Sequence, residues 1–547
     1  MSTLLEDVEA AAGLAVYGAR AVPGAADARA TLVADGLPGK LAEADPTLWG
    51  EAAEPEAKIR LGWLDTYRRS RELVRPITDL RDRLRAAGRD HVVLAGMGGS
   101  SLAPEVISRT LGAALTVLDT TDPRQIRAAL GDRLDRTVVV VSSKSGGTVE
   151  TDSHRRAYLE AFGGDTTDRF VVVTDPGSPL ESVAREMGAH LFLADPDVGG
   201  RYSALTAFGL VPTALAGVDV AQLLDEAEAF AASLAGDADN PALSLGAALG
   251  AAALAGRDKV VLVEDGSGIV GLGDWAEQLI AESTGKEGRG ILPVVVESPG
   301  SPGVTGDDVL TVTVGGSLQP GAVPGGGVAP HVAVNGPLGA QFLAWEYATA
   351  VAGRLLGINP FDQPNVAESK DNTKRILSEG LPRGAPAFTE GAVQVYGGAG
   401  LLGDATDLGT ALARLVSAIT DRGYLAVMAY LDRLGDADAA RVRTALAAHT
   451  SRPVTFGWGP RFLHSTGQYH KGGPQDASFL QITGVVGDDL PVPGRPYTFG
   501  ELQAAQAAGD RQAIAGRGRP LVRLHLTDRA AGIAQLLAAA DSLPRVN

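Results

Sequence analysis

Short apolar runs without polar alternation recur along the chain, and stretches of helical periodicity separate them. Such runs are typical of parallel strands, which are buried on both faces because helices cover both sides of the sheet. Strands joined by helical crossovers indicate a doubly wound parallel sheet, which binds ligands at the carboxyl ends of its strands. The strands predicted for this first sheet are His91–Ala95, Leu115–Asp119, Thr137–Val141, Phe170–Asp175 and His190–Ala194.

The same pattern returns after a helical stretch at Val220–Ala255. It predicts a second α/β unit of similar size, interrupted at 315–330 by a loop too rich in Gly and Pro to be regular. A third α/β piece follows from about Ala385. The strands predicted for these two units are Lys259–Asp265, Leu292–Glu297, Val309–Val314, His331–Asn335, Val393–Tyr396, Tyr424–Leu431, Pro453–Phe456, Phe479–Thr483 and Leu521–Leu526.

Residues 1–75 carry apolar positions at roughly helical spacing and predict helices, beginning with the run LLEDVEAAAGLAVYGARAV. The expected fold class is therefore α/β, with two doubly wound parallel-sheet domains, an N-terminal helical segment and a C-terminal α/β extension. Two similar α/β halves favour a site between them. The expected boundaries are 1–75 for the helical segment, 76–215 and 216–380 for the two domains, and 381–547 for the extension.

Charge and cysteine content exclude several classes of function. The chain has 48 basic and 65 acidic residues and a formal net charge of −17, which argues against nucleic acids and anionic membranes as partners. The absence of cysteine excludes disulfides, thiolate nucleophiles and zinc-thiolate sites. The acidic N-terminus does not resemble a signal peptide, and no apolar run approaches the ~18 residues of a membrane span. A cytoplasmic protein without metal sites is expected.

Two strand-to-helix turns have the residues of a phosphate site. The valine run at 138–141 ends in SSKSGGT and an acidic helix start, and the strand at His91–Ala95 ends in GMGGSS. Glycines let backbone N–H groups approach an anion, hydroxyls donate hydrogen bonds, lysine neutralises charge, and a helix N-terminus favours negative charge. Neither turn matches a P-loop or a dinucleotide fingerprint. Side by side, the two turns favour a phosphorylated small molecule.

Three further stretches carry groups suited to acid–base chemistry. Arg201 follows two glycines ahead of a helix, where it can stabilise an oxyanion. Gln278 and Glu282 share one helix face, and a partly buried carboxylate there suits a general base. Lys370 lies near the start of a helix that follows NPFDQPN. Taken singly, each of these charges fits a solvated surface at least as well.

Together, the motifs GMGGSS, SSKSGGTVET, VGGRYS, QLIAESTGK and NPFDQPNVAESK occur in this order across roughly 96–374. In order and spacing the chain resembles the phosphoglucose isomerase family, of the sugar isomerase (SIS) domain type. The resemblance implies reversible isomerisation of glucose 6-phosphate and fructose 6-phosphate through an enediolate, in glycolysis and gluconeogenesis. It also implies a homodimer that needs neither a metal nor an organic cofactor.

The resemblance assigns roles residue by residue. Arg201 matches the arginine that stabilises the enediolate, and Glu282 matches the base that moves a proton between C2 and C1. Gln278 matches a substrate contact, and Lys370 matches a lysine that assists ring opening and substrate binding. Cationic groups beside the developing enediolate agree with the chemistry. The residues that match the sugar-phosphate loops are Gly99, Ser100, Ser143, Lys144, Ser145 and Thr148.

One family residue is missing. Many members carry NGQHAF, whose histidine handles the ring-oxygen proton and reaches the neighbouring subunit's site. The comparable stretch here is VNGPLGAQFLAWEYA, with Gln341 or its neighbours where the histidine is expected. The candidates for this role are His331, His464 and His470, although an ordinary hydrogen-bonded histidine fits each of them. In the stretch VAESK, the glutamate stands at a different position from the one usual in this family motif, while Lys370 keeps its position.

The extension resembles the C-terminal region of isomerase modules fused to transaldolase, through GPRFLHSTGQ and HKGGP. No transaldolase activity is expected, and the HSTGQ loop is a candidate cap over the sugar site. Two alternatives stay open, a dual phosphoglucose/phosphomannose isomerase and a sugar-phosphate-binding SIS protein without turnover. Glu282 and Lys370 argue against the second, because binding alone requires neither residue.

Overall fold

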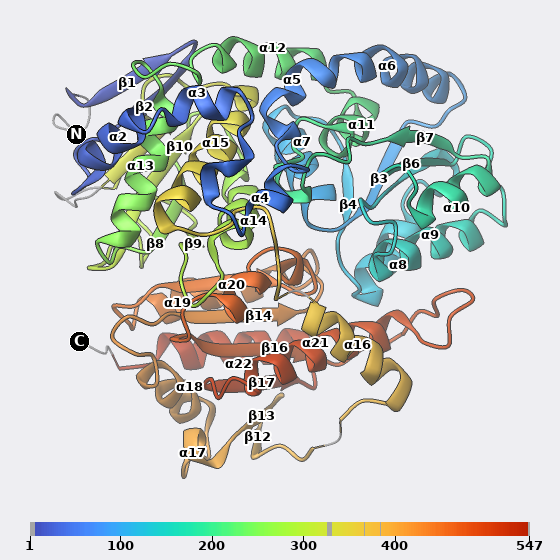
Figure 1. Cartoon of the computed structure of the whole chain (residues 1–547). Coiled ribbons are helices and arrows are strands. Elements are labelled where there is room, and N and C mark those ends of the chain that lie inside the picture. The colour runs from blue at the N-terminus through green and yellow to red at the C-terminus, as the bar shows by residue number, and fades with distance from the viewer. Residues whose placement is uncertain (1–5, 325–330, 366, 383, 545–547) are drawn as a thin grey trace.

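Three β-sheets organise the protein, as a computed structural model shows (Figure 1). The structure describes residues 6–324, 331–365, 367–382 and 384–544. Two sheets lie side by side in the upper part of Figure 1, and the third lies below them. The predicted α/β class with parallel sheets is confirmed. No helix in these ranges is both long enough and apolar enough to span a membrane.

The first sheet is entirely parallel and has the order β4-β3-β5-β6-β7. Its chain order reverses between β3 and β5, so the loops that leave these two strands diverge around a switch point. Gly96 and Ser142, the last residues of β3 and β5, are direct neighbours. The strands are His91–Gly96 (β3), Thr116–Leu118 (β4), Thr137–Ser142 (β5), Phe170–Thr174 (β6) and His190–Leu193 (β7).

Helices cover both faces of this sheet, which explains its unbroken valine run. Val138 and Val140 pack into the core on one face, and Val139 and Val141 pack into a separate core on the other. The first core includes helices Arg71–Ala86 (α6), Leu102–Thr110 (α7) and Ala207–Ala216 (α11). The second includes Pro123–Gly131 (α8), Val149–Ala161 (α9) and Pro179–Met187 (α10).

The second sheet repeats this strand order and adds a hairpin at its edge, giving β1-β2-β11-β10-β8-β9. Its parallel strands are Lys259–Glu264 (β8), Leu292–Val295 (β9), Val309–Gly315 (β10) and His331–Asn335 (β11). The hairpin consists of Val8–Ala11 (β1) and Leu14–Tyr17 (β2), with β2 antiparallel to β11. The helices of this unit are Val220–Ala231 (α12), Pro241–Leu254 (α13), Leu272–Thr284 (α14) and Leu338–Leu356 (α15).

The helix predicted at the very start of the chain is wrong, because β1 and β2 occupy that stretch. Ala12 and Gly13 have φ values of 45° and 87°, which end any helix and make a tight turn. Leu14–Tyr17 is fully buried against β11, so pairing with a sheet edge overrides the weak helical periodicity. The helices that follow this hairpin are Ala25–Ala34 (α2), Leu37–Ala42 (α3), Glu54–Ala57 (α4) and Thr66–Arg69 (α5), and the expected boundary after residue 75 falls inside α6.

The third sheet has the order β12-β13-β17-β16-β14-β15 and covers the second sheet directly. Val261 and Val263 of β8 share a core with Ala426 and Met428 of the third sheet. The opposite face of the third sheet packs against Leu408–Ser417 (α18), Arg441–Ala447 (α19) and Arg529–Asp541 (α22). The strands are Phe388–Glu390 (β12), Val393–Gly397 (β13), Leu425–Tyr430 (β14), Val454–Trp458 (β15), Ser478–Gly484 (β16) and Leu521–Leu526 (β17).

Two further helices of the extension, Gly467–Gly472 (α20) and Phe499–Ala515 (α21), connect it to the rest of the protein. Ala367–Glu379 (α16) packs along α21, and α20 lies beside α14. The extension is therefore part of the structure that surrounds the first two sheets. A short helix at Ala399–Leu402 (α17) and 3₁₀ turns complete the fold, the turns at Pro46–Trp49 (η1), Gly62–Asp65 (η2), Gly98–Ser100 (η3), Leu134–Arg136 (η4), Gly200–Tyr202 (η5), Ala437–Ala440 (η6) and Arg461–His464 (η7).

Candidate active site

A cavity of about 630 Å³ opens at the switch point of the first sheet, beyond the carboxyl ends of β3 and β5. It is lined by parts of all three units and of the N-terminal segment. The residues that the sequence motifs predicted for substrate binding and catalysis all line this cavity: Gly99, Ser100, Ser143, Lys144, Ser145, Thr148, Arg201, Gln278, Glu282 and Lys370. Residues separated by up to 271 positions thus meet around one space large enough for a sugar phosphate.

The loop after β3 is in backbone contact with the loop that carries Arg201. A Cβ atom added to Gly99 would lie 1.9 Å from the carbonyl oxygen of Gly200. At the preceding residue, Gly98, φ is 55°, and a Cβ there would lie 2.7 Å from Nε2 of Gln278. Glycines at these positions therefore let two loops and the helix α14 approach closely enough to enclose the cavity.

The loop after β5 presents hydroxyl and amino groups at the start of α9. Ser143 Oγ and Thr148 Oγ1 are hydrogen-bonded at 2.9 Å, and Lys144 Nζ lies 2.5 Å from Asp175 Oδ2. The side chain of Thr148 does not cap α9, so the N–H groups of the first helical turn are open to another acceptor. Together with the helix dipole, these donors can hold an anion such as a phosphate group.

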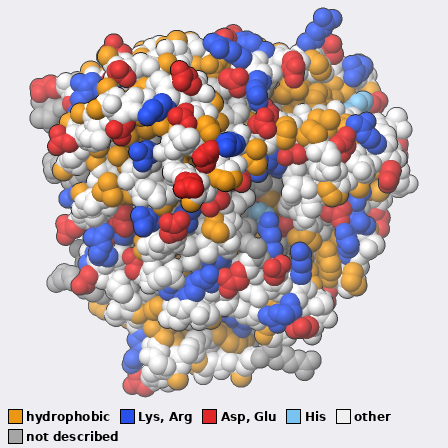
Figure 2. Space-filling view, in the orientation of Figure 1, with side chains coloured by type: hydrophobic (Ala, Val, Ile, Leu, Met, Phe, Trp, Pro, Cys, Tyr) orange, Lys and Arg blue, Asp and Glu red, His pale blue; other side chains and the backbone are white. Residues whose placement is uncertain are grey.

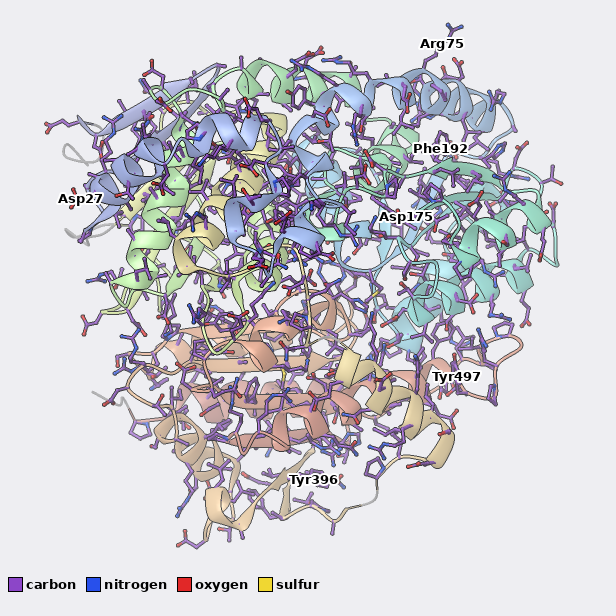
Figure 3. All side chains as sticks on the ribbon, in the orientation of Figure 1. Asp27, Arg75, Asp175, Phe192, Tyr396 and Tyr497 are labelled. Carbon is purple, nitrogen blue, oxygen red and sulfur yellow. The ribbon has the colours of Figure 1, made fainter. Side chains whose placement is uncertain are left out.

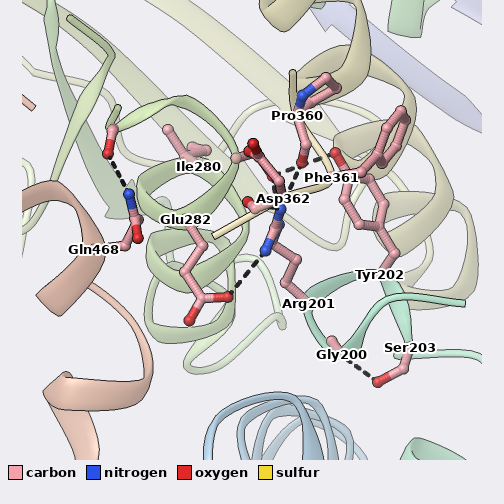
Figure 4. A network of polar contacts seen from close by, with 12 residues as sticks. Gly200, Arg201, Tyr202, Ser203, Ile280, Glu282, Pro360, Phe361, Asp362 and Gln468 are labelled. Atoms are coloured by element: carbon pink, nitrogen blue, oxygen red, sulfur yellow. Dashed lines mark hydrogen bonds and ion pairs between the residues drawn. The ribbon is translucent and has the colours of Figure 1, made fainter. Parts of the chain in front are cut away.

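Arg201 is a buried guanidinium with a fixed orientation (Figure 4). Its Nε donates to Ser283 Oγ at 2.9 Å, and its Nη2 donates to the carbonyl oxygens of Pro360 and Asp362 at 2.7 and 2.8 Å. The remaining arm, Nη1, lies 3.4 Å from Oε2 of Glu282. The positive charge is therefore directed at the space beside the Glu282 carboxylate.

Glu282 lies on α14 within the same buried region. Burial raises the pKa of its carboxyl, and Arg201 and a hydrogen bond with Gln278 offset part of this rise. A carboxylate with a raised pKa accepts a proton more readily than an exposed glutamate. Gln278 is buried too, and its Oε1 has no hydrogen-bond partner within the described part of the chain. That oxygen is positioned to accept a hydrogen bond from a ligand hydroxyl.

Of the histidine candidates, His464 lines the cavity. Its Nε2 lies 3.1 Å from Oε1 of Glu150, which also accepts a hydrogen bond of 2.6 Å from Gln506 Nε2. Burial alone would raise the pKa of Glu150, but the charge and hydrogen bond of His464, a backbone hydrogen bond and the charge of Lys370 hold that pKa below its ordinary value. A charged Glu150 therefore orients the imidazole through Nε2, and this contact does not use Nδ1 of His464.

A buried ion-pair network fixes the turn that carries His464. Arg461 Nη1 donates to Glu105 Oε2 at 2.5 Å and to Asp119 Oδ2 at 2.7 Å, and both acceptors belong to the first unit. Gln468 further on donates to the carbonyl oxygen of Gly285, at the end of α14, at 2.9 Å. The predicted HSTGQ loop of the extension thus lies against the cavity.

The other two histidines lie elsewhere. His331 begins β11, its Nε2 lies 3.2 Å from Thr313 Oγ1, and burial lowers its pKa to about 4. His470 is buried among aromatic rings such as Phe479, and burial lowers its pKa well below the ordinary value. Gln341, which the sequence comparison placed near the missing histidine, is buried on α15 and donates to the carbonyl oxygens of Gly315 and Val334.

Several residues that line the cavity were not predicted from the sequence. Arg60 and Glu56 form an ion pair of 2.8 Å at the end of the N-terminal segment, and Asp175 and Asp362 add two carboxylates. Asp175 follows β6, whose end is adjacent to β5, so sheet order could have identified it. Arg60 and Glu56 give no local signal, since only tertiary packing brings them there.

The chain is similar to curated proteins named for one activity. The family model "Phosphoglucose isomerase" matches residues 85–251. A glucose-6-phosphate isomerase from Rubrobacter xylanophilus is 32% identical over 55% of this chain and 86% of its own length. One from Symbiobacterium thermophilum is 30% identical over 58% and 87%. A probable glucose-6-phosphate isomerase from Haloarcula marismortui is 36% identical over 38% of this chain, which spans about half (49%) of that relative.

Solved structures agree with these matches in fold. A hypothetical protein from Thermus thermophilus superposes with a TM-score of 0.56 at 25% identity, covering 66% of this chain and 98% of its own. A glucose-6-phosphate isomerase from Chlamydia trachomatis gives a TM-score of 0.52 at 18% identity, covering 69% and 90%. With more than four fifths of two bacterial relatives matched at 30% identity or above, the chain belongs to the phosphoglucose isomerase family.

Proposed function

We propose that the protein is an aldose–ketose isomerase that interconverts glucose 6-phosphate and fructose 6-phosphate. Family membership supports the activity. One observation supports this cavity as the place where the reaction occurs. The buried pair of Glu282 and Arg201 lies in the same space as an anion-binding loop of the first sheet. A base, an adjacent cation and a phosphate-binding loop are the three elements that this reaction requires.

The phosphate group is assigned to the loop after β5. Ser143, Ser145 and Thr148 supply hydroxyl donors, and the N-terminus of α9 supplies backbone N–H groups. Lys144 contributes charge, although Asp175 shares that charge while the loop holds no anion. Binding at this end leaves the reacting carbons of the sugar for the buried end of the cavity.

Proton transfer is assigned to Glu282. It removes the proton from C2 of the open-chain aldose, the C–H electron pair forms a double bond between C1 and C2, and negative charge develops on O1. Nη1 of Arg201, beside the carboxylate, stabilises that enediolate. Glu282 then returns the proton to C1 while the hydroxyl proton on O2 moves to O1, which gives the ketose.

Ring opening is assigned to His464, with Lys370 assisting. Cyclic glucose 6-phosphate opens when the C1–O5 bond breaks, the ring oxygen takes a proton and the O1 hydroxyl gives one up. The carboxylate of Glu150 fixes Nε2, which leaves Nδ1 of His464 to carry the proton to the ring oxygen. The extension of this chain would thereby replace the histidine that many family members supply from the neighbouring subunit.

The reaction is tested by coupling fructose 6-phosphate turnover to a glucose-6-phosphate-specific dehydrogenase. We expect wild-type turnover and a loss of at least about 10²-fold in kcat for Glu282→Gln, because the amide cannot accept the proton. Because the pKa of Glu282 is raised, kcat/KM should fall on the acid side at a pH above the ordinary glutamate value of 4.5. The matched control is Glu186→Gln, at an exposed residue on α10, which should change neither kcat nor the pH dependence of kcat/KM.

Sugar-phosphate binding without turnover in the wild type would contradict the isomerase assignment and favour a binding protein. Surviving turnover in Glu282→Gln would contradict the assigned base alone. Mannose 6-phosphate in the same assay measures the tolerance for the configuration at C2.

The role of His464 has its own test. His464→Ala should lower kcat about 10- to 100-fold on cyclic glucose 6-phosphate, because ring opening loses its acid. The rate at which tritium is lost from C2 of the open-chain substrate should change little, because Glu282 is intact. His470→Ala, buried outside the cavity, is the control. An unchanged rate with the cyclic substrate would remove His464 from the mechanism.

We also propose, from the family resemblance, that the protein is a cytoplasmic homodimer that acts in glycolysis and gluconeogenesis. Sedimentation equilibrium and cell fractionation test the assembly and the location. A monomer with full activity would contradict the homodimer.

A further inference from the structure

A second cavity, of about 640 Å³, lies in the third unit, away from the candidate active site. It is bounded by the end of β13, the start of β17 and the C-terminal end of α21. Tyr396 lines it, and Figure 3 labels this residue low in the molecule, whereas Asp175 of the candidate active site is labelled in the upper part. The two cavities have no lining residue in common.

Three arginines line this second cavity, Arg511 on α21 and Arg519 and Arg523 at β17. None of them forms an ion pair with a carboxylate in the described ranges, although the chain has 65 acidic residues. In the same unit, Arg529 lies 2.7 Å from Asp122 and 2.9 Å from Asp436. Acidic and basic side chains also alternate over the surface that Figure 2 shows. Other arginines of the described ranges, such as Arg257 and Arg289, also lack a carboxylate partner, but these three line a single cavity.

The surroundings of the three arginines favour a bound anion. Burial lowers the pKa of each of the three guanidinium groups, and the charge of Arg523 lowers that of Arg511 further. Cations that are partly desolvated and repel one another raise the free energy of the folded state unless an anion compensates them. A bound oxyanion would remove both penalties.

Two of the three arginines are held in place by neighbouring side chains. The guanidinium carbon of Arg523 lies 3.7 Å from the centre of the Tyr396 ring, a stacked arrangement that orients the guanidinium group. Nε of Arg519 donates to Oε1 of Gln475 at 3.1 Å. Beside them, Gly398 and Gly400 have open space where a side chain would stand. Ordered donors around an open space favour a small ligand with several oxygens.

We propose that this arginine cavity, formed by Arg511, Arg519, Arg523 and Tyr396, binds a small dianion or trianion of the phosphate-ester or polycarboxylate class. Its volume fits a metabolite rather than a macromolecule. The net charge of −17 also opposes an extended polyanion, whereas a small one contacts only the local positive field.

Helix α21 connects this cavity to the candidate active site. Arg511 lies near its C-terminal end, whereas Gln506, one turn earlier, donates to Glu150, the partner of His464. Gln512 accepts a hydrogen bond of 2.6 Å from Arg375 on α16, the helix that carries Lys370. Binding of the anion is therefore expected to alter turnover, and this part of the inference rests on the proposed function.

Equilibrium dialysis with radiolabelled inorganic phosphate tests the site in four forms of the full chain. These are the wild type, Ser145→Asp in the phosphate loop, Arg511→Gln/Arg523→Gln, and all three substitutions together. We expect two, one, one and no phosphates bound per chain, with affinity at the arginine cavity falling at least about tenfold. Arg75→Gln/Arg441→Gln, at two exposed arginines, removes the same two charges and is the matched control, which should keep both phosphates.

The outcomes separate the two sites. If Arg511→Gln/Arg523→Gln still binds two phosphates, the arginine cavity is overturned. If Ser145→Asp still binds two, the phosphate loop of the proposed function is wrong while the arginine cavity stands. If circular dichroism shows that the double variant is unfolded, Arg523→Lys replaces it. This substitution keeps the positive charge but loses the planar fork of the guanidinium, so the affinity for phosphate should still fall several-fold. Glycerol 3-phosphate and citrate, as competitors, then distinguish phosphate esters from polycarboxylates.

Coupling is measured as the effect of phosphate on kcat at saturating fructose 6-phosphate. We expect a change in the wild type that is absent in Arg511→Gln/Arg523→Gln, whose own kcat without phosphate should match the wild type. If phosphate binds but does not alter kcat, the proposed coupling is overturned, while the anion site in the arginine cavity remains supported.

Discussion

The two parallel sheets of this protein share a strand order but differ at their switch points. In the first sheet, the loops after β3 and β5 surround an open cavity. In the second, Asp265 follows β8 and accepts hydrogen bonds from Ser267 N at 2.8 Å, Gly321 N at 2.8 Å and Asn335 Nδ2 at 2.9 Å. An internal carboxylate thus occupies the place at which the first sheet is open to a ligand.

This difference shows how a repeated fold can divide one reaction between two copies. Donors at a switch point bind an external anion when the chain supplies none of its own. The second unit uses its switch point for stability and contributes the helix α14 with Glu282 instead. Under the proposed assignment, the first unit supplies the phosphate loop and the second supplies the base, and Arg201 lies beside Glu282 where the two units meet.

The strongest way to break the comparison is to close the first switch point. In Gly99→Ala, the new Cβ would stand 1.9 Å from the carbonyl oxygen of Gly200, so the Arg201 loop must move. A shift of about 1 Å in a catalytic group can cost roughly 10²-fold in rate, and we expect kcat/KM to fall by at least that factor. Gly131→Ala, which meets no atom within 4 Å, should be neutral. Wild-type kinetics in Gly99→Ala would show that the loop contact does not position Arg201.

The complementary change opens the second switch point. Asp265→Ala removes the acceptor from three donors, and the free energy of unfolding should fall by about 2–4 kcal/mol. If the two switch points are equivalent in geometry, phosphate should now stabilise this variant more than the wild type. Thermal unfolding with and without phosphate measures both effects, with the exposed Asp307→Ala as control. A destabilised variant that phosphate does not rescue would mean that the second switch point lacks the geometry of an anion site.

The smallest expected effect concerns Asp175, which neutralises part of the positive charge of Lys144 in the first unit. Asp175→Asn should free that lysine for the phosphate group and lower the KM for fructose 6-phosphate a few-fold, with kcat little changed. The effect should shrink as ionic strength rises, because salt screens the lysine. A higher KM would instead indicate that Asp175 holds Lys144 in the position that binds phosphate.

The two loops of the candidate site were predictable from local sequence because they follow strand ends, where glycines and hydroxyls have few structural reasons to cluster. Gln278, Glu282 and Lys370 lie on helices instead, and only their order with the other motifs indicated them. Apolar runs predicted most strands of the three sheets, but not the short strand β12 at Phe388–Glu390, which is only partly buried. The β1–β2 hairpin was not predicted either, since its stability comes from pairing with β11, more than 300 residues away. Nor could the sequence separate His464 from His470, six positions apart, because only the fold directs one to the cavity and buries the other among aromatic rings.

The packing of the third sheet on the second has a consequence for biosynthesis. Val261, Val263 and Val294 leave the ribosome long before Ala426 and Met428, which cover them. Until then, one face of the nascent second sheet has no partner, and such a face is what molecular chaperones bind. A message truncated before the third sheet would therefore yield a chain that aggregates or is degraded. Folded protein would accumulate only from ribosomes that have translated the extension.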